Sequence, residues 1–222
     1  MPSCIGRGLL DFPGAASHEE AAPAGTAARL WEPAVVLAAL LCNSRLDVLT
    51  NSADEASGCA TSSSSASWTG LRVLELGAGL GYVGLHLACL GASVTLTDLD
   101  VAEVLVRRSL SANTDAVAAA GGSTSFEILD WAICGRGAGF APGAGSVDIV
   151  LAADPVYDDA TSQHFAACLS QLLLRASSDE GELSNGSARS SARCGAIVAH
   201  KHRPGVCCAE GVHGIRGARE PG

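Results

Sequence analysis

The 222-residue sequence has no apolar run near the roughly 20 residues that a membrane-spanning helix needs, so no membrane contact is expected. No basic segment leads into an apolar stretch near the amino terminus, which argues against a secretory signal or a transit peptide. We therefore expect a cytoplasmic protein, with the nucleus as the alternative compartment. The nine cysteines form no CxxC pair, so neither a disulfide framework nor a structural zinc site is expected.

Basic residues are also scarce, because Asp and Glu outnumber Lys and Arg by 23 to 14 and the net charge is −9. Tight binding to nucleic acid depends largely on Lys and Arg that neutralise phosphates, so a nucleic acid partner is not expected. A protein or a small molecule is the better partner. His200 and His202 lie one apart on a predicted strand, but no third ligand has suitable spacing and no metal is expected.

The sequence does contain a regular alternation of strand and helix patterns. Strands are predicted at 71–76, 92–97, 123–129, 147–152 and 196–199. Helices are predicted at 82–90 and 101–112, and a third helix carries an apolar stripe over 165–173. This order is typical of an α/β, doubly wound, mostly parallel sheet of the Rossmann-like type. No strand-length apolar run follows residue 203, so the last strands of the sheet are expected to be absent.

The composition predicts one folded domain, interrupted by inserts that are rich in small residues. The domain is expected over 29–203, the inserts near 51–67, 135–145 and 176–193, and irregular segments at 1–28 and 204–222. The inserts contain too few large apolar residues to offset the conformational entropy of ordering them.

The most informative stretch is a glycine turn between the first strand and its helix. Gly77, Gly79 and Gly81 remove the side chains that would keep a ligand away from the backbone. A dinucleotide fingerprint needs a small residue where this chain has Tyr82, which makes a nicotinamide oxidoreductase a poor alternative. The turn therefore predicts a nucleotide-like cofactor of another class.

Three polar or aromatic positions at the same sheet edge support a cofactor site. Glu75 precedes the glycine turn, and Asp98 ends the second strand, where it can accept hydrogen bonds from two ribose hydroxyls. Trp131 follows the third strand, and its flat ring can stack on adenine. The alternative for Trp131 is a core tryptophan.

Five separated motifs resemble the class I, seven-strand S-adenosylmethionine methyltransferases, and within them the protein-lysine group called methyltransferase family 16. The motifs are Leu30-Trp31-Glu32-Pro33, Val73 to Leu85, Thr97-Asp98, Leu129-Asp130-Trp131 and Asp148 to Tyr157. The resemblance covers about residues 29–203. It implies S-adenosylmethionine as the cofactor and a lysine of a protein substrate as the acceptor, and we expect a monomer.

The resemblance also implies roles for particular residues. The implied cofactor-binding residues are Trp31, Glu75, Gly77, Gly79, Gly81, Asp98, Asp130, Trp131 and Ala153. Asp154 and Tyr157 are the expected catalytic pair, since a hydrogen-bonding pair beside the methyl donor can orient an amine lone pair. Asp154 or Asp130 can also assist the loss of the lysine proton. The alternative for Asp154 and Tyr157 is a capping Asp and an edge Tyr.

Two other functions are kept as alternatives. The sequence from Asp154 to Tyr157 is one residue away from the Asp-Pro-Pro-Tyr box of enzymes that methylate planar amides or adenine amino groups. A catalytically silent interaction module that retains the fold is the second alternative, because the strands that shape the family's acceptor pocket are not recognisable after Arg203.

Overall fold

A computed structural model describes residues 25–43, 67–138, 147–178, 194–201 and 213–215. Its centre is a six-stranded sheet in the order β3-β2-β1-β4-β5-β6. The strands are β1 (Arg72–Leu76), β2 (Ser93–Asp98), β3 (Ser123–Ile128), β4 (Ile149–Ala153), β5 (Gly195–Ala199) and β6 (His213–Ile215). The first five strands are parallel and β6 is antiparallel, which confirms the predicted α/β, mostly parallel fold.

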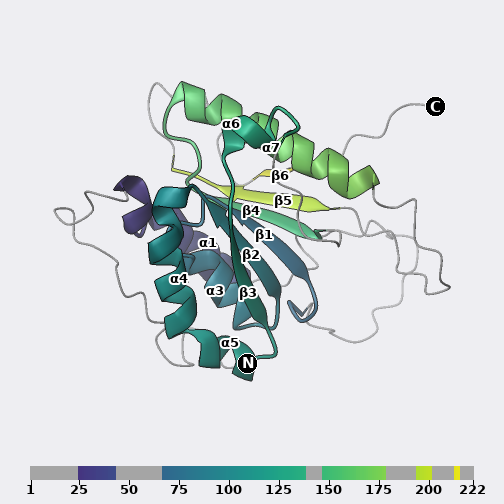
Figure 1. The fold of residues 1–222 in the computed structure, drawn as a ribbon. Helices are drawn as coiled ribbons and strands as arrows, with labels where there is room; N and C mark the ends of the chain where they lie inside the picture. The colour runs from purple at the N-terminus through teal and green to yellow at the C-terminus, as the bar shows by residue number, and fades with distance from the viewer. Residues whose placement is uncertain (1–24, 44–66, 139–146, 179–193, 202–212, 216–222) are drawn as a thin grey trace, which may run out of the picture.

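Helices cover both faces of this sheet (Figure 1). One face carries α1 (Glu32–Asn43), α3 (Tyr82–Ala88), α4 (Glu103–Ala112) and α5 (Thr114–Ala119). The other face carries α6 (Trp131–Cys134) and α7 (Asp159–Ser178). Two short 3-10 turns, η2 (Gly25–Ala28) and η3 (Asp100–Ala102), lie near the carboxyl ends of the strands. Among the described residues no helix is both long and apolar enough to cross a membrane.

The central strand β1 explains why the sheet is covered on both sides. Val73 packs in the cluster with α1 and α3, whereas Leu74 and Leu76 pack in the cluster with α7. Side chains of a strand alternate between faces, so a strand buried on both faces needs apolar residues at almost every position. The one charged side chain buried in β1 is Glu75, which lies on the α3 face and belongs to the site described below.

All five predicted strands are present within two residues at each end, and the predicted helix stripe is the buried face of α7. The prediction that no strand follows residue 203 is wrong, because His213–Ile215 pairs with β5. Three residues are too few to leave an apolar pattern in the sequence. The turn η2 likewise falls in a segment predicted to be irregular, and α7 continues to Ser178, beyond the predicted start of an insert.

Several sequence predictions fall outside the described residues. These are most of the first 28 residues, nearly all of the insert at 51–67, most of the inserts at 135–145 and 176–193, and most of the tail after residue 203. His202, one of the two histidines considered for a metal site, lies there as well.

Candidate active site

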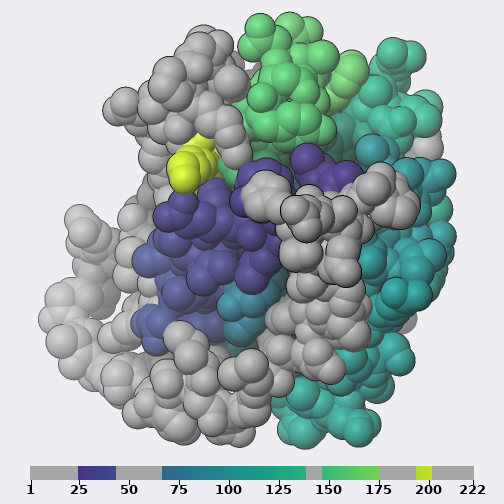
Figure 2. All heavy atoms as spheres, turned by 90° about the vertical axis from the view of Figure 1, so that its left-hand side faces the viewer, coloured from purple at the N-terminus to yellow at the C-terminus, as the bar shows by residue number. Residues whose placement is uncertain are grey.

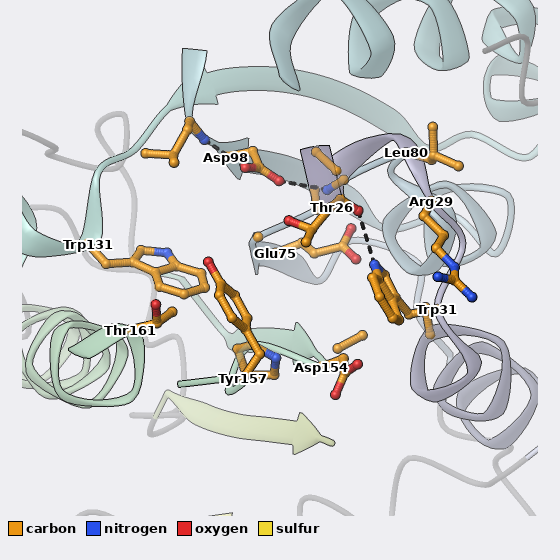
Figure 3. Close-up of a pocket in the computed structure, with 18 of the residues that line it drawn as sticks. Thr26, Arg29, Trp31, Glu75, Leu80, Asp98, Trp131, Asp154, Tyr157 and Thr161 are labelled. Atoms are coloured by element: carbon orange, nitrogen blue, oxygen red, sulfur yellow. Dashed lines mark hydrogen bonds between the residues drawn. The ribbon is translucent and has the colours of Figure 1, made fainter. Parts of the chain in front are cut away.

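A cavity of about 390 Å³ opens at the carboxyl ends of the parallel strands. Its walls come from η2 and the start of α1, the glycine turn, the end of β2, α6, and the loop after β4 (Figure 3). Doubly wound sheets bind ligands at this edge. Ten of the predicted site residues line the cavity, namely Trp31, Glu75, Gly77, Gly79, Asp98, Asp130, Trp131, Ala153, Asp154 and Tyr157. Gly81 does not line it.

The glycine turn has the backbone conformation that glycine permits. Gly77, Gly79 and Gly81 have φ angles of 65°, 55° and 75°, in the left-handed region that other residues rarely adopt. A Cβ at Gly77 would lie 3.0 Å from Cζ2 of Trp131, so the turn approaches that ring closely. A Cβ at Gly81 would meet Leu96 at 2.5 Å, which shows that Gly81 serves packing behind the turn.

The carboxylate of Asp98 is fixed by two backbone hydrogen bonds. Gly79 N–H donates to Oδ2 at 2.8 Å, and Leu99 N–H donates to Oδ1 at 2.7 Å. Burial raises the pKa of Asp98, and these two bonds lower it in part. Each carboxylate oxygen can accept a further bond, so the group remains able to bind hydroxyl donors in the cavity.

The carboxyl group of Glu75 lies at the inner end of the cavity (Figure 3). The residue is only 2% exposed, and Oε2 accepts a hydrogen bond of 2.9 Å from Gly84 N–H in α3. Burial raises the pKa of Glu75 to about 8, with a further contribution from the nearby charge of Asp98. A carboxyl with this pKa holds its proton over much of the neutral pH range.

Trp131 begins α6 and forms part of the cavity wall. Its ring packs edge-to-face against Phe165 of α7, with centroids 5.2 Å apart, and it lies beside Tyr157 (Figure 3). The ring is therefore anchored in the core on one side and lines the cavity on the other. Asp130 caps this helix, because its Oδ1 accepts a 2.8 Å hydrogen bond from Ala132 N–H.

Asp154 has an unusual backbone at the end of β4. Its φ angle is 57°, a conformation that no other non-glycine residue has in the described part of the chain. Its backbone N–H donates to Ala199 O at 2.6 Å, and its Oδ1 accepts a 3.2 Å bond from Lys201 N–H. Aspartate is one of the few residues that tolerate this region. The side chain lies between Tyr157 and Trp31 in the cavity (Figure 3).

Trp31 and η2 form the opposite wall. The indole Nε1–H donates to Thr26 O at 3.0 Å, and the Arg29 guanidinium lies 4.5 Å from the Trp31 ring centroid. Thr26 lies in the segment 1–28, which was predicted to be irregular, and Arg29 lies in the predicted domain but was not among the predicted site residues. Thr161 and His164, which line the cavity from the first turns of α7, were not predicted either. The sequence did contain a signal for these two residues: they are three residues apart on a helix that follows Tyr157, and residues at this spacing share a helix face.

The arrangement separates two kinds of chemistry within one cavity. Glu75, Asp98 and Trp131 offer two carboxyl groups and a flat ring beside the glycine turn. Asp154 and Tyr157 offer a carboxylate and a phenol at the rim, where Tyr157 is 49% exposed. A group bound at the turn can therefore meet a second molecule that enters past the rim.

Comparison with known proteins identifies relatives. A family model described as lysine methyltransferase matches residues 15–181. EEF1A lysine methyltransferase 3 of Mus musculus is 32% identical over 137 residues, which are 62% of this chain and 47% of that protein. Protein N-lysine methyltransferase METTL21A of Danio rerio is 33% identical over 139 residues, which are 62% of this chain and 51% of that protein. The chain thus spans about half the length of these relatives.

Two solved structures that match part of the chain are methyltransferases by name. Magnesium protoporphyrin IX methyltransferase from Synechocystis PCC 6803, with bound SAH, has a TM-score of 0.35 and 24% identity, and the match covers 48% of this chain and 43% of that one. A TehB-like SAM-dependent methyltransferase from Corynebacterium glutamicum has a TM-score of 0.37 and 16% identity, with 59% and 54% covered.

The family model extends over most of the chain and includes the glycine turn, Asp98, Trp131, Asp154 and Tyr157. The family resemblance drawn from the sequence motifs is thereby confirmed. The chain belongs to the lysine methyltransferase family.

Proposed function

We propose that the cavity binds S-adenosylmethionine and that the protein methylates a lysine side chain of a protein substrate. The observation that carries this proposal is one cavity that joins the glycine turn, Asp98 and Trp131 to Asp154 and Tyr157. The two relatives named above are lysine methyltransferases of proteins, which supports the same acceptor class. A monomer in the cytoplasm, acting on a protein partner, completes the proposal.

The residues at the inner side of the cavity fit this cofactor. A Cβ at Gly77 or Gly79 would fill the space beside Trp131 or Ala27, so the turn leaves its backbone accessible. Asp98 offers oriented oxygens for the ribose hydroxyls, and Trp131 offers a ring face for adenine. Glu75 is the second carboxyl on this side, and the positive charge of the methionine part would favour its ionised form. When bound, S-adenosylmethionine supplies an electrophilic methyl group.

The residues at the rim suit an amine acceptor. The Asp154 carboxylate and the Tyr157 hydroxyl can hold a lysine nitrogen by hydrogen bonds and aim its lone pair into the cavity. Asp130 was the other candidate for assisting proton loss, and in both residues Oδ1 accepts one backbone N–H, which leaves the second oxygen for this role. The proposal assigns the role to Asp154, which is part of the pair with Tyr157 at the rim. Its backbone bond to Ala199 and its bond from Lys201 N–H keep the carboxylate in place.

The proposal is tested by methyl transfer from labelled S-adenosylmethionine to proteins of a cell lysate, followed by residue-level mass spectrometry. The expected product is methylated lysine. Label on glutamine, asparagine or nucleic acid instead would favour an enzyme that methylates planar amides or amino groups. Cofactor binding without any transfer would favour the silent interaction module.

A further inference from the structure

The sequence contains a single lysine, Lys201, and the fold places its backbone beside Asp154, a residue of the cavity wall. Lys201 lies two residues after the last residue of β5, and its backbone N–H donates to Oδ1 of Asp154 at 3.2 Å. Asp154 lines the cavity, so the backbone of the one lysine is anchored to a cavity residue. Figure 2 shows this end of β5 at the surface beside α1. Position and residue type together make Lys201 a candidate acceptor.

The Lys201 side chain is held away from the cavity by a weak interaction. Its Nζ lies 3.0 Å from Oε2 of Glu32, the first residue of α1. The two side chains are 61% and 70% exposed, and ion pairs of this kind contribute little to stability. The ammonium sits on a flexible four-carbon stem, so it can leave Glu32 by rotation about side-chain bonds.

We propose that Lys201 is a site of methylation by the cavity of its own chain, and that Glu32 holds the unmodified side chain back. This inference rests on the proposed function, because the methyl group comes from S-adenosylmethionine. The anchored backbone makes the reaction intramolecular, which raises the effective concentration of the amine at the rim. No second protein is needed to present the lysine.

The chemical step is balanced within these groups. The Lys201 ammonium first loses one proton, which passes by way of the Asp154 carboxylate to solvent. The nitrogen lone pair then forms a bond to the methyl carbon, and the carbon–sulfur bond breaks with its electron pair left on sulfur. The products are methylated Lys201, S-adenosylhomocysteine and one proton. The nitrogen keeps its positive charge but loses hydrogen-bond donors, so each transfer weakens its hydrogen bonding to Glu32.

The test is the mass of the full chain after incubation with S-adenosylmethionine. The expected result is a gain of one or more methyl groups that peptide mapping locates at Lys201. Lys201→Arg keeps the positive charge and removes the primary amine, so this variant should gain no mass while calorimetry still detects cofactor binding. The rate constant should not change with protein concentration. A rate that rises with concentration would show transfer between copies and contradict the intramolecular reaction.

The holding role of Glu32 has a matched control. Glu32→Gln breaks the ion pair and should raise the rate about two- to fivefold, the range that release of an exposed pair allows. Glu103→Gln removes another glutamate in an ion pair, half-exposed and 2.8 Å from Arg107 in α4, and should leave the rate unchanged. Equal rates in Glu32→Gln and the unaltered chain would contradict the proposed role of Glu32.

Failure of this inference differs from failure of the proposed function. If calorimetry detects the cofactor and lysate proteins are methylated, but Lys201 gains no mass, the inference alone is wrong. If the cofactor does not bind, both are wrong. Methylation of Lys201 in the absence of any lysate substrate would support both.

Discussion

Two carboxyl groups with raised pKa values, Glu75 and Asp98, share the inner part of the cavity. Burial is the main cause in each case, and the charge of Asp98 adds to the effect on Glu75. Burying such groups costs stability once they are ionised. A bound cation would reduce this cost, because a nearby positive charge favours the ionised forms of both carboxyl groups.

The pKa of Glu75 predicts how stability depends on pH. Between the ordinary value of 4.5 and about 8, the native state holds a proton that the unfolded chain has released. Native stability therefore falls as pH rises through this window, by up to about 1.4 kcal/mol per pH unit. Glu75→Gln can still accept the Gly84 hydrogen bond and has no proton to lose, so it should remove this slope.

The measurement is urea unfolding at several pH values between 5 and 8 for both chains. The quantity to compare is the difference between the two free energies of unfolding, because burial also raises the pKa of Asp98 and lowers the pKa of His86. A difference that stays constant across the window would contradict the assigned pKa. Glu103→Gln, the same substitution at a half-exposed glutamate outside the cavity, serves as the control.

Asp154 combines an unusual backbone with the proposed role at the acceptor. Asp154→Asn tolerates the left-handed conformation and keeps an oxygen for Lys201 N–H, so stability should change by less than about 0.5 kcal/mol. Methyl transfer should fall by about 100-fold or more, the usual effect of losing a group that accepts a proton. Asp154→Ala should cost a further 1 to 2 kcal/mol of stability, roughly the backbone penalty. Unchanged transfer in Asp154→Asn would refute the catalytic assignment.

At the scale of elements, α3 is docked through Gly84. A Cβ at Gly84 would lie 2.5 Å from Glu75 Oε2 and 3.0 Å from Val94 Cγ1. The neighbouring Gly81 adds the left-handed turn that starts the helix. The helix therefore approaches β1 and β2 closely enough for a backbone N–H to reach the buried Glu75 carboxyl.

Gly84→Ala should destabilise the protein by about 1 to 3 kcal/mol, since the added methyl group overpacks a buried contact. Gly195→Ala is the matched control, because a Cβ at Gly195 meets nothing within 4 Å and its φ is not in the left-handed region. That control should be neutral or slightly stabilising. Chemical denaturation of both variants measures the effect, and equal stabilities would contradict the close docking of α3.

Sequence patterns predicted the elements that have strong periodicity and missed those that do not. The apolar run of β1 and the apolar stripe of α7 each indicate which residues of the element are buried. Both elements were therefore predictable from the sequence. The strand β6 and the turn η2 have three and four residues, and they depend on pairing and packing with distant segments. The contribution of η2 to the cavity, through Thr26 and Ala27, was hidden for the same reason.

At the scale of the whole molecule, the site is assembled from segments far apart in the chain. Trp31, Glu75, Asp98, Trp131 and Tyr157 come from five different stretches, and one sheet edge collects them. The sequence could predict this convergence because carboxyl ends of parallel strands share an edge. It could not predict that Gly81 packs away from the cavity or that Lys201 lies against Glu32, since both depend on tertiary distances.

The central claim is that the cavity is an S-adenosylmethionine site, and calorimetric titration tests it most directly. The full chain should bind S-adenosylmethionine and not NAD. Asp98→Ala should weaken binding at least about tenfold, since it removes a charged hydrogen-bond acceptor. Asp100→Ala, an exposed carboxylate two residues away, should bind as the unaltered chain does. Binding of NAD alone, or of neither ligand, would contradict the account.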